Sequence, residues 1–359
     1  MIKLMNECIR KRKYIIAGLL SVVLAVSCVG CGSSNKITIE DGKNTVVMTI
    51  EDYDVTLSEY NLFLLQYITM QNLDPDKITE EKLSSIQDEV SYEIKLEIVE
   101  YLLAKNVEKL ELSDEEKQGI ENNTTNYIEK FGEDFLNDYG IDKEAVNQLF
   151  TEQAYITALT NKAKEDLAND KYEESAEEFK DIKFHTVYYA LFPSIEYDED
   201  NNPVVDDNGE NVLLSEDKLK EQKKKAEELQ KRASSGEKLE DLIEEYGIGA
   251  YSGEERSYEG AYIDELNKVL EGMEKDDISD VVETDAGYMV VRMDNPNDED
   301  YKEYALRYAA VQYANQTITT LQQNWLSASG CLEVEPDKEA LKKVDVKSIC
   351  KQLQDKGIY

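Results

Sequence analysis

Few side chains in this 359-residue sequence are suited to covalent or metal chemistry. His185 is the only histidine, and Cys331 and Cys350 are the only cysteines beyond residue 31. No CxxC pair or His/Cys cluster has the spacing of a metal site, so we expect neither a metal nor another cofactor. No Ser/His/Asp or Cys/His set, phosphate-binding loop or paired-carboxylate motif indicates a hydrolase. Chemistry that relies on several imidazoles is therefore excluded.

The first thirty residues have the pattern of a secretory signal. A basic stretch precedes an apolar run, residues 14–26, and a small-residue exit follows that ends at Cys31. The run is shorter than the about 20 apolar residues that a membrane span needs. Because the exit ends in cysteine, it resembles a bacterial lipobox, whose cysteine is acylated. We expect Cys31 to carry the lipid, with Cys28 or an uncleaved anchor helix as alternatives, and the body to be tethered outside the cytoplasmic membrane.

The composition is strongly acidic. The chain has 40 Lys and Arg against 77 Asp and Glu, and its net charge is −37. Without residues 1–30 the net charge is near −41. A charge of this sign repels phosphate backbones, so we expect no nucleic-acid partner. For Cys331 and Cys350 we expect two thiols, with a disulfide in an oxidising compartment as the alternative.

A helical pattern dominates residues 58–178. Apolar side chains recur there at spacings of three and four, which predicts helices over residues 58–71, 79–104 and 143–168. Ser113 followed by Glu116 has the capping-box pattern that opens a further helix. These helices need one another to bury their apolar faces.

The rhythm changes to period two at residues 182–192, where aromatic and β-branched residues predict a strand. Charged helices follow, residues 247–260 read as a glycine-punctuated loop, and residues 288–293 are predicted to form a final strand. From Asp298 a helix of nearly thirty residues carries an apolar face up to Trp325. The helices of residues 58–178 are the only large partner surface, so we expect the chain to return to them.

The order of these segments resembles the PrsA/SurA type of extracytoplasmic foldase, in which a parvulin-like prolyl isomerase domain is inserted in a helical chaperone domain. Residues 49–60 resemble the strand-turn-helix that opens such proteins, and residues 236–242 resemble their Gly-Glu-x-Phe motif. Residues 277–292 are the best match, similar to Gly-Glu-Ile-Ser-x-Pro-Val…Gly-Tyr-His-Ile-Ile. Residues 322–325 resemble the closing helix.

The resemblance implies an α+β fold with four parts. Residues 1–30 would be the signal and 31–45 a tether. A mostly helical chaperone domain would comprise residues 46–178 plus 297–346, and a degenerate, small antiparallel-sheet parvulin-like domain would comprise residues 179–296. The partners implied are unfolded or newly exported polypeptides, and the membrane through the lipid; a homodimer is left open.

The departures from the family pattern concern the site. Tyr189 and Met289 occupy the positions of the two usual histidines, and His185, four residues early, reads as an ordinary strand residue. The family's acidic position corresponds to Glu254, and Leu266 occupies the place of the proline-pocket phenylalanine. By resemblance, the candidate catalytic residues are therefore Tyr189 and Glu254.

The expected peptide-binding cleft is formed by Tyr189, Leu266, Met273 and Met289. Prolyl isomerisation breaks no covalent bond, and a catalyst needs an apolar pocket and polar groups that favour the twisted amide. Methionine and leucine keep the apolar volume, whereas the polar network is less well preserved. Plain core packing of Leu266 and Met289 is the alternative to a client groove.

Three functions compete on this evidence. The first is a tethered folding factor that binds exported polypeptides, with isomerase activity weak or lost. The second is an active peptidyl-prolyl cis-trans isomerase in which Tyr189 and Glu254 do the polar work. The third is a non-catalytic surface interaction lipoprotein.

Overall fold

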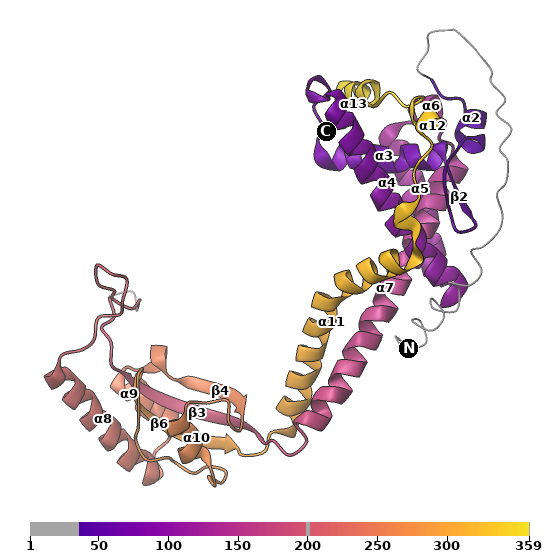
Figure 1. Cartoon of the computed structure of the whole chain (residues 1–359). Helices are drawn as coiled ribbons and strands as arrows, with labels where there is room; N and C mark the ends of the chain where they lie inside the picture. The colour runs from indigo at the N-terminus through magenta and orange to yellow at the C-terminus, as the bar shows by residue number, and fades with distance from the viewer. Residues whose placement is uncertain (1–35, 199–201, 359) are drawn as a thin grey trace. The chain divides into compact units, whose positions relative to one another are not determined.

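The structure, a computed structural model, describes residues 36–198 and 202–358. The predicted signal and both candidate lipid sites, Cys28 and Cys31, lie outside the described residues. Within the described ranges, no helix has the length and apolar character that crossing a membrane requires. These residues form two compact units (Figure 1): one runs to Asp166 and resumes at Ala314, and the other is Leu167–Tyr313.

The first unit is mainly helical. Its elements are a short helix α2 (Ile39–Asn44), a hairpin of β1 (Val46–Ile50) and β2 (Tyr53–Thr56), the helices α3 (Leu57–Gln71), α4 (Glu80–Leu102), α5 (Asp114–Phe131) and α6 (Glu133–Asp138), most of α7 (Lys143–Glu178), the end of α11 (Glu299–Ser329), and α12 (Lys338–Leu341) and α13 (Val346–Asp355). The π-helical turn η2 (Leu103–Val107) follows α4 directly. The predicted helices are thus present, and the unit boundary falls inside α7 and α11, not at their ends.

Polar side chains fix where the helices of this unit begin. The Thr56 hydroxyl accepts from the Glu59 amide at the start of α3, and the Thr79 hydroxyl accepts from the Lys82 amide at the start of α4. The predicted capping box at Ser113 is confirmed, because its hydroxyl accepts from the amide of Glu116 and the Glu116 carboxylate accepts from the Ser113 amide. Each cap satisfies amides that the helix itself leaves without partners.

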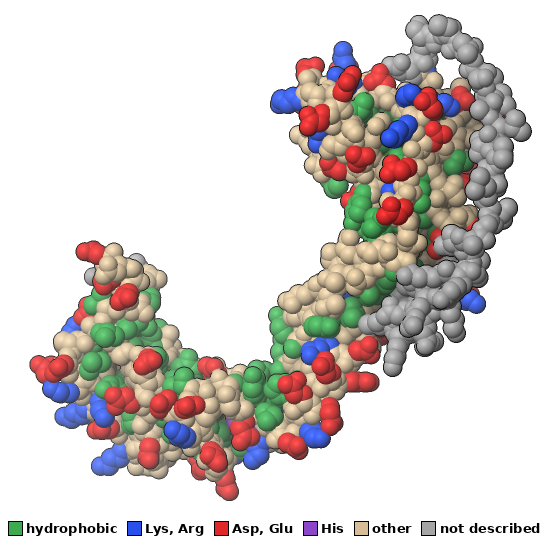
Figure 2. Space-filling model, in the orientation of Figure 1, with side chains coloured by type: hydrophobic (Ala, Val, Ile, Leu, Met, Phe, Trp, Pro, Cys, Tyr) green, Lys and Arg blue, Asp and Glu red, His purple; other side chains and the backbone are tan. Residues whose placement is uncertain are grey.

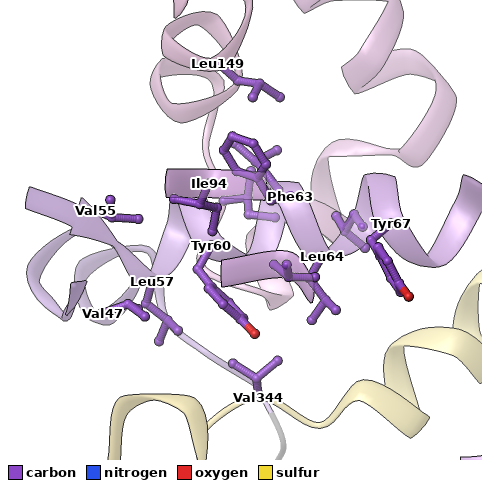
Figure 3. Packing of buried hydrophobic residues seen from close by; sticks show 14 of the residues in the cluster. Val47, Val55, Leu57, Tyr60, Phe63, Leu64, Tyr67, Ile94, Leu149 and Val344 are labelled. Carbon is purple, nitrogen blue, oxygen red and sulfur yellow. The ribbon is translucent and has the colours of Figure 1, made fainter. Parts of the chain in front are cut away.

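Helix α3 lies at the centre of the first unit's core. Apolar side chains all round the helix are buried, including Leu57, Tyr60 and Leu64, and Val344 of the C-terminal segment lies against them (Figure 3). Trp325 of α11 is buried in the same core. The chain therefore returns to its first unit after completing the second.

The C-terminal helix α13 belongs to this core, which the predicted domain end at residue 346 omits. Val346, Ile349, Cys350 and Leu353 recur at spacings of three and four and are all buried. Such a stripe needs a partner surface, and here the first unit provides it. Cys350 and Cys331 are both buried and are not joined in a disulfide.

The second unit contains the four-stranded sheet. Its strands are β3 (Phe184–Pro193), β4 (Gly253–Tyr258), β5 (Val282–Thr284) and β6 (Gly287–Asn295), arranged β4-β3-β6-β5 with every pair antiparallel. Helices α8 (Glu216–Ser234) and α9 (Leu239–Tyr246) pack on one face, and α10 (Asp264–Leu270) packs on the other. The predicted α+β fold with a small antiparallel sheet is confirmed.

Strand β4 corrects the sequence prediction, which read residues 247–260 as a loop. It is an edge strand paired only with β3, and Glu254, Glu255 and Arg256 on it are exposed. Because most side chains of this strand face water, it carries no apolar alternation from which a strand could be recognised. It nevertheless decides which acidic side chain lies beside the candidate site.

A group of buried carboxyls lies within the first unit. The Tyr53 hydroxyl contacts both Glu152, which is 0% exposed, and Glu59, at 3.0 Å from its Oε1. A phenol has a single proton, so one of these contacts requires a protonated carboxyl that donates to the tyrosine oxygen. Gln148 also donates to Glu152, over 2.8 Å.

Burial and mutual repulsion raise the pKa values of these carboxyls. Burial raises the pKa of Glu59 well above its ordinary value, and the charge of Glu152 raises it further. The same two causes raise the pKa of Glu97 to about 8, and burial raises the pKa of Glu100 to about 7. Protonated carboxyls are therefore part of the folded first unit near neutral pH.

We predict that the first unit loses stability as the pH rises from 5.5 to 8.5. Folding raises the pKa values of Glu97 and Glu100. Their contribution to the free energy of unfolding is therefore complete below the unfolded pKa of about 4.5, and it is lost as the pH rises through the folded values near 7 and 8. A loss of about 1 kcal/mol lowers the Tm of a unit of this size by about 2–4 °C. Fluorescence of Trp325, the only tryptophan, reports this unit's thermal unfolding in the full chain.

Glu97→Gln is expected to make this pH dependence shallower, because a neutral amide replaces a carboxyl that must deprotonate. Glu129→Gln, in an exposed position on α5, is the matched control and is expected to follow the unmodified chain. A Tm that stays constant or rises between pH 5.5 and 8.5 would contradict the raised pKa values.

Candidate functional site

The candidate site lies on the α10 face, the face of the sheet that α10 covers. The register of β3 with β6 pairs Tyr189 with Val291 and Leu191 with Met289. Directly opposed residues of an antiparallel pair point to the same face. Val291 is packed in the cluster under α10, so Tyr189 and Met289 project on that side.

The structure brings the four predicted cleft residues together. Leu266 is 7% exposed and is part of the hydrophobic cluster under α10. Tyr189, Met273 and Met289 are half-buried and pack against this cluster from its margin. Leu266 is thus a core residue, whereas the other three leave part of their side chains accessible.

Glu254 is not on this face. Its partner across the β3–β4 ladder is Tyr188, which packs with the cluster under α8 and α9. The Glu254 carboxylate pairs there with Arg256, whose Nε lies 2.9 Å from Oε1. The resemblance led us to expect Glu254 and Tyr189 in one site. The structure places them on opposite faces of the sheet.

The carboxylate on the face of Tyr189 is Glu255. It stands opposite Val187, a buried member of the α10-face cluster. Burial raises the pKa of Tyr189, and the charge of Glu255 raises it further. The sequence carried no signal for Glu255, because β4 lacks the apolar alternation from which the strand, and so the side on which Glu255 lies, could be recognised.

Tyr262 is a second tyrosine of this site that the sequence did not single out. It lies just before α10, is half-buried and packs against the same cluster. Burial raises its pKa, the charge of Glu255 adds to the effect, and the Ser257 hydroxyl lowers it. Gly253, which is opposite Tyr189, has no side chain and leaves the ring unobstructed on the β4 side.

His185 is on the same strand face but is engaged elsewhere. It is 6% exposed, and its Nδ1 lies 3.2 Å from the Pro296 carbonyl oxygen, which accepts the hydrogen bond when that nitrogen is protonated. Its partner on β4 is Ser257. A buried imidazole held by a backbone carbonyl performs a packing role.

The arrangement offers apolar contact and phenol hydroxyls rather than imidazole chemistry. Because the pKa of Tyr189 is raised, its hydroxyl is protonated near neutral pH and can donate a hydrogen bond. Met273 and Met289 supply adaptable apolar surface. Within the residues that the structure describes, no group of three His, Cys, Asp or Glu side chains is placed to hold a metal ion.

Comparison with known proteins places the second unit in a family. Residues 172–305 match the family model described as the PPIC-type PPIASE domain, so this part of the chain is a parvulin-type domain. No curated protein matches the chain.

Solved structures similar to this chain are foldases and chaperones by their descriptions. PrsA from Bacillus subtilis is 19% identical, with 88% of this chain and 98% of that chain covered and a TM-score of 0.24. The foldase protein PrsA from Lactococcus lactis is 11% identical, with 86% and 99% covered and a TM-score of 0.36. A chain from a structure of SurA-like chaperones of Campylobacter jejuni is 13% identical, with 82% and 98% covered and a TM-score of 0.23.

We predict that Leu266→Ala destabilises the second unit, because it leaves a cavity under α10. Replacement of a buried leucine by alanine costs about 2–5 kcal/mol. Hydrogen exchange of the β3 and β6 amides in the full chain measures the change. Ile263→Ala, at a side chain 50% exposed, is the control and is expected to change protection little. Protection unaltered by Leu266→Ala would mean that Leu266 is not part of the core.

Proposed function

We propose that this chain is a membrane-anchored extracytoplasmic folding factor that binds exported, unfolded polypeptides, with prolyl isomerase activity weak or lost. The observation that carries the proposal is the parvulin-type domain at residues 172–305. By resemblance, Tyr189 and Met289 take the positions of the family's two histidines in this domain. A domain that keeps the apolar surface for a peptide but not the polar network is suited to holding chains.

The weak-isomerase part is supported by the composition of the α10 face. Twisting an X-Pro bond is favoured by an apolar seat for the ring and by a donor to the amide nitrogen. Met273 and Met289 preserve the apolar part. The polar part is reduced to phenol hydroxyls, whose raised pKa values keep them protonated and make them weak acids and therefore weak donors to the amide nitrogen.

Polypeptide binding is supported by aromatic surface on the second unit's portion of α11. Tyr304 and Tyr308 are 63% and 56% exposed, and their rings stack with centroids 6.1 Å apart. Val311 and Tyr313 are exposed on the same helix. Tyrosine combines an apolar ring with a polar tip. Its ring can therefore pack against varied chains, while its hydroxyl lets the side chain stay exposed to water in the free protein.

The extracytoplasmic location and the lipid anchor rest on the sequence of the first 31 residues. The basic start, short apolar run and terminal Cys31, or Cys28, support export and acylation. The net charge of −37 limits self-association by mutual repulsion, which suits a protein that stays dispersed among other exported chains.

We predict that the mature chain suppresses aggregation of a chemically unfolded client, such as rhodanese diluted from guanidinium and followed by light scattering. The double variant Tyr304→Ser/Tyr308→Ser is expected to lower this suppression severalfold, since it removes the stacked exposed rings. Tyr92→Ser, at an exposed tyrosine of the first unit, is the matched control. If the mature chain neither slows aggregation nor binds the client, the folding-factor proposal is wrong.

The second candidate function, an active isomerase, is favoured by one observation: a protonated Tyr189 hydroxyl and the Glu255 carboxylate share the α10 face. We nevertheless predict that a proline-peptide assay shows a rate close to the uncatalysed one, whose time scale is tens to hundreds of seconds. Tyr189→Phe is expected to leave that rate unchanged. A substantial rate that falls severalfold in both Tyr189→Phe and Glu255→Gln would establish the active isomerase instead.

A further inference from the structure

One acidic side chain of the candidate site has no cation beside it. The ion pairs among the described residues engage both arginines of the sheet elsewhere: Arg256 pairs with Glu254, and Arg292 pairs with Glu240 and Asp294. None of those ion pairs includes Glu255, which is exposed on the edge strand β4. The α10 face therefore presents an uncompensated negative charge at its margin.

Two tyrosine side chains of the α10 face lie beside this charge. Tyr189 and Tyr262 are both close enough to Glu255 for its charge to raise their pKa values. Both rings and Met289 are half-buried against the α10-face cluster. A carboxylate beside tyrosine rings matches the two parts of a long basic side chain, an apolar stem and a cationic head.

We propose that the α10 face binds unfolded polypeptides through a lysine or arginine side chain, with its cationic head at Glu255 and its stem against the ring of Tyr189. This inference rests on the proposed function and names the chemistry of the segment that the site selects. It assigns Glu255 the role of specificity-determining residue.

The desolvation of Glu255 decides between a basic and an apolar occupant. An apolar ring, such as that of proline, would cover an ionised carboxylate and remove water from it without supplying a partner, which is costly. A guanidinium or ammonium group supplies that partner and, over a tyrosine face, adds a cation–π attraction. A basic side chain is therefore expected to bind at Glu255 more favourably than proline.

The charge of the surrounding chain acts in the same direction. Residues 253–300 contain sixteen acidic side chains and four basic ones, and two of those four are the paired arginines. Acidic side chains are also spread over the visible surface (Figure 2). Such a field attracts cationic segments and raises their local concentration, with an effect that salt screens.

The test compares two end-capped, fluorescein-labelled peptides, Ser-Ala-Leu-X-Phe-Ala-Ser, in which X is arginine or its neutral analogue citrulline. Fluorescence anisotropy with the full mature chain is expected to show a Kd about tenfold lower for the arginine peptide, because only arginine forms an ion pair with Glu255. A tenfold difference in Kd corresponds to about 1.4 kcal/mol of binding free energy. Glu255→Gln is expected to bring the two Kd values together without weakening the citrulline peptide. A third peptide with proline at X is expected to bind no better than citrulline.

Glu283→Gln is the matched control, because it removes the same charge from β5 on the side of the sheet that carries Tyr288, away from the α10 face. The control is expected to keep the arginine preference. Equal binding of arginine and citrulline peptides, or a preference that survives Glu255→Gln, overturns the inference while the folding-factor proposal stands. Absence of binding by all three peptides, together with no effect on client aggregation, overturns both.

Discussion

The antiparallel pairing of β3 with β6 is the interaction on which the second unit depends. Because side chains alternate along a strand, this one register sends Ala190, Phe192 and Val290 to the cluster under α8 and α9, and Val187, Val291 and Met293 to the cluster under α10. A slip of one residue would exchange the two sets and expose both cores. The position of every candidate site residue on these strands follows from the same register.

Gly287 shows how tightly this pairing is made. Its φ is +139°, and a Cβ at that position would lie 2.1 Å from the carbonyl oxygen of Phe192. Only glycine allows the close approach with which β6 begins. The hairpin with β5 and the ladder with β3 both start at this residue, so Tyr288 and Met289 inherit their directions from it.

The two units place acidic side chains of consequence in different environments. In the first, carboxyls are enclosed around Tyr53 and keep protons, because burial and mutual repulsion disfavour their charges. In the second, Glu255 stays at the surface, and its charge acts on the neighbouring tyrosines. A protonated buried carboxyl stabilises a fold at lower pH, whereas an exposed, uncompensated one is available to a partner.

The sequence alone determined the classes of the elements and the order in which they occur. Period three-to-four apolar spacing indicated the long helices, period two indicated β3, and Ser113 with Glu116 marked a helix start, because these patterns express local geometry. It also identified Tyr189, Leu266, Met273 and Met289 as candidates that meet at one site.

Tertiary structure decided what local patterns do not carry. Edge strand β4 has almost no buried side chains, so only its pairing with β3 reveals it and places Glu255, not Glu254, beside Tyr189. Likewise, the core position of α13 depends on contacts with residues 75–77, about 270 residues earlier in the chain, which no spacing within α13 specifies.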